Sequence, residues 1–130
     1  MTTTPSIDVR WRAGDNEVAW TRDGVEIRKT FAAPPDQVIA WPDPPSVIVV
    51  ETLRGPHSRI DNAVVFNTDG TERTRLRPPR LSREPRWDIG FYTVHPDPYG
   101  LVAVFATQAG DFWGRPDLNT GELNDIAPWR

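Results

Sequence analysis

Two stretches of this 130-residue chain repeat one pattern: Glu17-Val-Ala-Trp-Thr-Arg-Asp-Gly24 and Asn62-Ala-Val-Val-Phe-Asn-Thr-Asp-Gly70. Each stretch runs from apolar residues into Asp-Gly, where glycine readily adopts the positive φ that a tight hairpin turn requires. The residues that follow the two turns, 25–31 and 71–76, again have the composition of strands. We therefore predict a β-hairpin in each stretch.

A second pattern follows each hairpin: Trp41-Pro-Asp-Pro-Pro-Ser-Val-Ile-Val-Val-Glu-Thr52 and His95-Pro-Asp-Pro-Tyr-Gly-Leu-Val-Ala-Val-Phe-Ala-Thr107. Proline removes a ladder donor and biases the preceding residue toward extended geometry, so Pro-Asp-Pro predicts a turn between two strands. The continuous apolar runs 47–50 and 101–105 are typical of strands that are buried on both faces.

A partial third copy of the hairpin pattern appears near the end of the chain, Asp111-Phe-Trp-Gly-Arg-Pro-Asp-Leu-Asn-Thr-Gly-Glu122. The corresponding glycines are 46 residues apart in the first interval and 51 in the second. We predict one all-β, antiparallel domain over residues 1–130, with little helix. Its units are repeat 1 at about 17–54, repeat 2 at about 62–110 and a partial repeat 3 at about 111–130, a final hairpin.

The first residues also have the alternation of a strand. Ile7, Val9 and Trp11 would lie on one face, with polar side chains between them on the other. We expect this strand to pair beside the C-terminal copy, because such pairing would tie both ends of the chain to the sheet.

Four-strand units of this length, with turns such as Leu118-Asn-Thr-Gly-Glu122, resemble the blades of β-propellers. A closed propeller has at least four blades, whereas this chain has two full copies and a fragment. The resemblance therefore implies a small barrel or sandwich, an open partial propeller, or a ring completed by several chains. All three arrangements stay open at this point.

No sequence motif points to catalysis or to a cofactor. The chain has no cysteine and two histidines, His57 and His95, without the spacing of a zinc site or a nucleophile elbow. Asp117-x-Asn119-x-Gly121 has the start of a calcium loop but not its remaining ligands, so an Asx-stabilised turn is the better reading. We predict no enzyme, no metal and no cofactor, although a hydrolytic carboxylate pair would leave no local signal.

The N-terminus has neither a basic segment nor an apolar core of a signal peptide, and the longest apolar run is residues 47–50. We therefore expect a soluble, cytoplasmic protein without a membrane partner.

Charge is unevenly distributed along the chain. The net charge is −3, but residues 71–86 carry +4 between two acidic segments. This basic segment contains six arginines, three alternating in a predicted strand and three in the loop that follows: Arg73, Arg75, Arg77, Arg80, Arg83 and Arg86. They would either pair with acids of a neighbouring strand or bind a protein partner that has an acidic patch. We do not expect nucleic-acid binding, because the chain is acidic overall and the segment lacks interleaved aromatics.

The tryptophans divide into two groups. Trp20 and Phe66 are equivalent positions of the repeat, which favours a core role for both. Trp41, Trp113 and Trp129 are less constrained, and if exposed they could stack on sugar rings or anchor a protein interface.

These features favour a non-enzymatic protein-binding module, for example an immunity or inhibitor protein, that binds an unidentified partner through the six arginines. The alternative is a carbohydrate-binding, lectin-like propeller assembled from several chains. This alternative leaves open the question whether the protein is a homo-oligomer.

Overall fold

The computed structural model describes residues 7–55, 58–80 and 85–129. They form eleven strands, and η1 (Pro85–Trp87), a short 3-10 turn, is the one helical element among them. Every strand pairing is antiparallel. The prediction of an all-β, antiparallel fold is confirmed.

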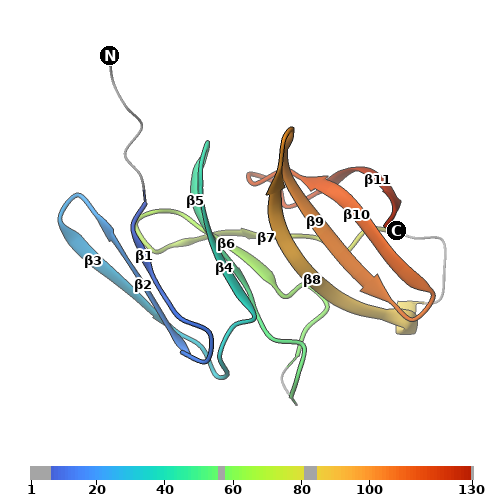
Figure 1. The fold of residues 1–130 in the computed structure, drawn as a ribbon, viewed down its shortest axis with the longest axis horizontal. Helices are drawn as coiled ribbons and strands as arrows, with labels where there is room; N and C mark the ends of the chain where they lie inside the picture. The colour runs from blue at the N-terminus through green and yellow to red at the C-terminus, as the bar shows by residue number, and fades with distance from the viewer. Residues whose placement is uncertain (1–6, 56–57, 81–84, 130) are drawn as a thin grey trace.

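Three sheets lie side by side, in chain order (Figure 1). The N-terminal sheet contains β1 (Val9–Arg10), β2 (Glu17–Arg22) and β3 (Val25–Thr30). The middle sheet contains β4 (Gln37–Pro42), β5 (Pro45–Val50), β6 (Ala63–Phe66) and β7 (Glu72–Arg75). The C-terminal sheet contains β8 (Asp88–Asp97), β9 (Gly100–Thr107), β10 (Gly110–Pro116) and β11 (Leu123–Pro128). Each sheet is a meander of sequential strands, and no pairing between the described strands closes the sheets into a barrel or ring.

The Asp-Gly hairpins form where the sequence predicts them. Arg22 pairs with Val25 across Asp23 and Gly24, whose φ angles of 48° and 78° define the tight turn. In the turn at Asp117, the side-chain oxygen Oδ1 accepts backbone N–H groups of Asn119 and Thr120. The Asx-stabilised turn is therefore confirmed.

The two Pro-Asp-Pro segments also sit at hairpins, but their turns differ by one residue. Pro42 pairs with Pro45 in the first copy, so the turn begins at the aspartate. In the second copy β8 continues to Asp97, which pairs with Gly100 and accepts the backbone N–H of Tyr99 through Oδ1 at 2.9 Å. In the first copy the aspartate is thus a residue of the turn itself. In the second copy it is the last residue of the strand, and its side chain accepts a hydrogen bond from the turn.

The boundaries of the sheets do not coincide with the boundaries of the sequence repeats. The middle sheet joins the second strand pair of the first copy to the first strand pair of the second copy. The ladder between β5 and β6 is extended by Glu51, which donates its backbone N–H to the carbonyl of Asn62 at 2.8 Å. Between β3 and β4, by contrast, Pro34 and Pro35 have no N–H to donate, and the chain passes into the next sheet.

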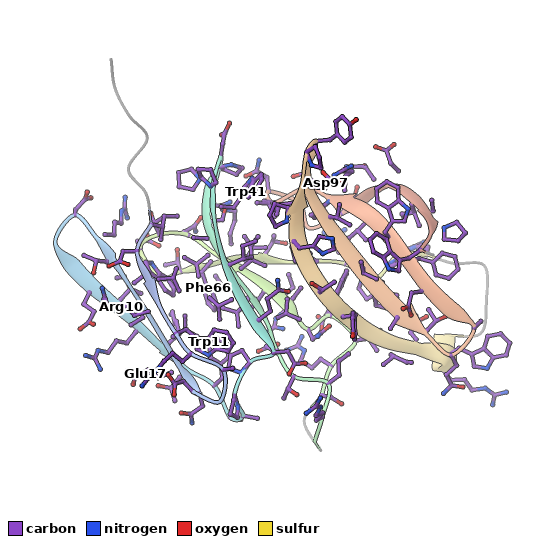
Figure 2. The ribbon with its side chains drawn as sticks, in the orientation of Figure 1. Arg10, Trp11, Glu17, Trp41, Phe66 and Asp97 are labelled. Atoms are coloured by element: carbon purple, nitrogen blue, oxygen red, sulfur yellow. The ribbon has the colours of Figure 1, made fainter. Side chains whose placement is uncertain are left out.

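The middle sheet is buried on both faces. One face packs against the C-terminal sheet and the other against the N-terminal sheet, through two separate clusters of apolar side chains. Residues 47–50 alternate between these clusters and are fully buried, which confirms a strand covered on both sides. Trp20 and Phe66 are core residues as predicted, and their rings contact each other at 5.9 Å between centroids. Figure 2 shows Phe66 between the N-terminal and middle sheets.

The first strand is placed differently from our expectation. Ile7, Val9 and Trp11 do pack inward, against the cluster that contains Trp20. However, β1 pairs with β2, so the expected pairing beside the C-terminal copy is wrong. The apolar face of β1 is needed to complete the cluster around Trp20, and that cluster lies at the N-terminal end of the stack.

Side-chain amides from β4 and from the β5–β6 connection cover the free edge of β8. Asn62 accepts the N–H of Phe91 at 2.6 Å and donates to its carbonyl at 2.9 Å. Gln37 does the same for Val94, at 2.9 Å and 2.6 Å. Each amide thus occupies the place of a neighbouring strand, so that edge groups are satisfied and the two sheets are joined.

Candidate functional site

The two ends of the sheet stack present different surfaces. At the N-terminal end, Arg28 pairs with Glu17 at 2.9 Å and with Glu26 at 3.0 Å, and Arg10 pairs with Glu26 at 3.1 Å. Hydrogen bonds from Arg28 lower the pKa of Glu26. Arg10 and Glu17 project from this sheet in Figure 2. Such a layer of exposed, mutually paired charges is typical of a solvated face.

At the C-terminal end, strand register places a different set of side chains outward. His95 pairs with Val102 and Trp113 pairs with Val104, on the side of the sheet opposite the core cluster. Both valines are almost fully buried, at 2% and 1% exposure, because longer side chains cover them. We call these covering residues the outer aromatic face: His95, Asp97, Trp113, Arg115 and Trp129.

The aromatic rings of this face contact one another and a cation. The rings of His95 and Trp129 meet edge to face at 5.9 Å, and the Arg115 guanidinium lies 5.3 Å from the Trp113 ring centroid. Trp129 is 43% exposed, so the last tryptophan of the chain covers the face while keeping much of its ring in solvent.

Asp97 and Arg115 form a bidentate ion pair on the same face. Arg115 donates to the two carboxylate oxygens of Asp97, both at 2.7 Å, and to the carbonyl of Leu101 at 3.2 Å. The hydrogen bonds from Arg115 lower the pKa of Asp97 to about 2. About three-quarters of each side chain is buried, so the pair is a rigid polar element within an aromatic surface.

Exposed apolar side chains also gather around the C-terminal sheet. Of the eight large exposed hydrophobic residues in the described part of the chain, six belong to this sheet, to its turns or to adjoining residues. Tyr99 is 87% exposed and Tyr92 is 68% exposed. The six are Trp87, Ile89, Tyr92, Tyr99, Ile126 and Trp129.

Two of the six predicted binding arginines are engaged within the middle sheet. Arg73 donates to Asn67, Ser46 and the carbonyl of Pro45. Arg75 donates to Glu51 at 2.6 Å and to the carbonyl of Asp61 at 3.0 Å. Arg73 and Arg75 therefore make contacts within the protein, which is the alternative to binding a protein partner.

The other predicted arginines lie nearer the C-terminal sheet. Arg77 is 67% exposed and forms a loose pair with Glu122 at 3.6 Å, while its backbone N–H bonds to the carbonyl of Gly121. Arg80 and Arg86 are exposed, and Arg86 lies in η1, directly before β8. Arg83 lies outside the described residues, as does His57.

The predicted tryptophans do not form one group. Trp41 packs against the core cluster between the middle and C-terminal sheets, and its indole donates to the carbonyl of Asp43 (Figure 2). Trp113 and Trp129 share the outer aromatic face. No sequence pattern groups His95, Asp97 and Arg115 with these tryptophans, although the alternation of His95 and Asp97 in one strand indicates a shared face.

Within the part of the chain that the structure describes, no group of three or more histidine, cysteine or acidic side chains is arranged to hold a metal ion. In the same part, no helix has the length and apolar character needed to span a membrane. Comparisons with protein-family models, with curated proteins and with solved structures each found no match to this chain.

Proposed function

We propose that this chain is a non-enzymatic protein-binding module whose contact surface is the outer aromatic face together with the exposed side chains around it. The supporting observation is the difference between the two ends of the stack. A stacked array of repeats stays soluble when its terminal faces are polar. The N-terminal face has such a polar layer, whereas the C-terminal sheet has tryptophan and histidine on its outer face and exposed tyrosines in β8 and in the β8–β9 turn.

The residue types on this surface are those that dominate protein interfaces. Tryptophan, tyrosine and arginine are enriched among the side chains whose truncation costs most binding energy. The preformed pair of Asp97 and Arg115 adds a polar contact that needs little reorganisation on binding.

The partner that we propose has an acidic patch. Arg77, Arg80 and Arg86 are exposed beside the C-terminal sheet, in the segment with the positive charge. They would speed association with an acidic surface, while Arg73 and Arg75 hold the middle sheet together. An immunity or inhibitor protein that binds a toxin or an enzyme is a role of this kind, for a protein in the cytoplasm.

The test compares the two ends of the stack. A partner is isolated with the wild-type protein and purified, and its Kd is then measured by calorimetry. We expect the double variant Tyr99→Ser, Trp129→Ser to bind at least about tenfold more weakly, a loss of about 1.4 kcal/mol or more. Val25→Ser is the matched control, because Val25 is 61% exposed on the N-terminal sheet.

Two outcomes would overturn the proposal. One is equal affinity of the double variant and the wild type, and the other is an equal loss in the Val25→Ser control. The arginine contribution is separable, since Arg77→Glu with Arg80→Glu should slow association and reduce its salt dependence.

Carbohydrate binding is the second candidate, in a lectin-like ring assembled from several chains. The observation in its favour is that Trp113 and Trp129 share a face with the planar polar groups of Asp97 and Arg115. It ranks second because Arg115 already lies over the Trp113 ring, which leaves Trp129 as the more exposed platform. A glycan-array signal that Trp129→Ala abolishes would favour it, and a strictly monomeric protein with no glycan signal would remove it.

A further inference from the structure

A cavity lies at the opposite side of the middle sheet from the proposed interface. It has a volume of about 400 Å³, and most of its lining residues directly follow β3 or β5. Phe31 and two alanines form an apolar wall, and the other wall carries Glu51, Arg54, Arg59 and Arg75. Volumes of this size are typical of sites for small molecules.

Two of the three arginines of this cavity are neutralised by carboxylates. Arg75 pairs with Glu51 at 2.6 Å. Arg59 donates to both oxygens of Asp61, at 2.8 Å and 2.9 Å. This pairing, above all the hydrogen bonds that Arg59 donates to Asp61, raises the pKa of Arg59. The two bidentate pairs hold these arginines in fixed positions.

Among the described residues, no carboxylate pairs with Arg54. Its side chain has no ion pair or hydrogen bond to any residue that the structure describes. Arg54 is exposed and lines both this cavity and an adjoining hollow of about 410 Å³; the two share Ala33, Thr52 and Arg54.

Hydroxyl groups line the cavity beside Arg54. Thr52 accepts the backbone N–H of Arg54 through Oγ1 at 3.1 Å, so its hydroxyl hydrogen remains available to donate. Ser58 adds a second hydroxyl to the lining. The apolar wall is held in place by Phe31, whose ring contacts Phe66 edge to face at 6.4 Å.

We propose that this cavity binds a small organic anion, a carboxylate or a phosphate ester that carries an apolar group. Arg54 and the two hydroxyls would bind the anionic head, since guanidinium forms its strongest hydrogen bonds with carboxylate and phosphate. The apolar body would pack on Phe31 and the alanines. The site is separate from the outer aromatic face, so this proposal does not depend on the protein-binding function.

The test is a titration of ¹⁵N-labelled protein, followed by NMR, with benzoate and phenyl phosphate as probes. The two anions share one ring, and therefore distinguish a carboxylate site from a phosphate site. Benzamide is the neutral control. We expect saturable shifts of the amides of Phe31, Thr52 and Arg54 with at least one anion and not with benzamide.

Arg54→Gln should weaken that binding by at least about tenfold. Arg22→Gln is the matched control, because Arg22 is an exposed arginine at the far end of the same β2–β3 hairpin that supplies Phe31. Both variants alter exposed side chains, and their spectra report directly whether the fold is retained.

Three results would each contradict the proposal that this cavity binds a small organic anion. Neither anion shifts these amides up to about 20 mM, a range that detects a Kd weaker than 1 mM. Alternatively, benzamide binds as well as the anions do, or Arg54→Gln leaves the midpoint of the titration unchanged.

Discussion

At the scale of single residues, two glycines show how the same backbone conformation can serve different purposes. Gly24 and Gly121 have similar positive φ angles, 78° and 82°. Gly24 faces open space, whereas a Cβ on Gly121 would clash with the backbone carbonyl oxygen of Arg75. Gly24 therefore serves only a turn, while Gly121 also lets the β10–β11 turn approach the end of β7.

The first prediction compares alanine at these two positions. Gly24→Ala should cost about 1 kcal/mol of unfolding free energy, the penalty for a Cβ at positive φ. Gly121→Ala should cost at least about 2 kcal/mol more, because the turn must move away from β7. Urea denaturation of the two variants measures the difference, and equal losses would show that the turn does not pack against Arg75.

At the scale of elements, the edge of β8 is protected by single side chains rather than by a strand. Asn62 is fully buried and satisfies both backbone groups of Phe91, while it also donates to the carbonyl of Glu51 at 2.8 Å. One side chain therefore joins the β5–β6 connection to the C-terminal sheet.

The second prediction concerns Asn62→Ala. Removal of the amide leaves buried backbone groups without partners, each at about 1–3 kcal/mol, so a total loss of about 3 kcal/mol is expected. Asn124→Ala is the control, since Asn124 is exposed and its replacement should change stability by less than about 0.5 kcal/mol. A small loss for Asn62→Ala in urea denaturation would mean that another group or water replaces the amide.

The third prediction is a dependence of stability on pH through the pair of Asp97 and Arg115, which joins the β8–β9 turn to β10. The pKa of Asp97 falls from 3.8 to about 2 on folding, so its contribution is present above about pH 4 and is lost as the pH falls toward 2. The Tm difference between wild type and Asp97→Asn should therefore shrink over that range.

Calorimetry at several pH values measures this difference, and Asp36→Asn provides an exposed carboxylate away from Arg115 for comparison. A difference in Tm between wild type and Asp97→Asn that stays constant down to pH 2 would contradict the low pKa.

At the scale of the whole molecule, stability is centred on the middle sheet. Its central strands β5 and β6 take part in both apolar clusters, whereas the N-terminal sheet packs through one face only. The outer strands of the N-terminal sheet can therefore open without exposing the apolar cluster between the middle and C-terminal sheets.

The fourth prediction follows from this asymmetry. In native-state hydrogen exchange, the amides of Val49 and Val64 should exchange slowest, at the rate of global unfolding. Amides of β1 and β3 should exchange faster, through local opening of the N-terminal sheet. Uniform protection across the three sheets would instead indicate that the stack unfolds as one cooperative unit.

Much of the fold could be predicted from local patterns. Asp23-Gly24 and the continuous apolar run at residues 47–50 each act through near neighbours, and both hairpins and the doubly buried strand are confirmed. Only part of the candidate site could be predicted from the sequence. Trp113 and Trp129 were singled out, but Asp97 and Arg115 are 18 residues apart, and their ion pair depends on the register of β9 between their strands.

Local residue order specifies the Asp-Gly turns, the strands and the inward faces of the strands, because positive φ and the two-residue period of a strand are local properties. The packing of distant segments specifies which strands share a sheet and that the aromatic face lies at one end of the stack. It also ties Arg75 to Glu51, while the side chain of Arg54 has no ion pair with a residue that the structure describes. These features depend on how distant segments pack, and the energy of packing is shared among residues that no local pattern connects.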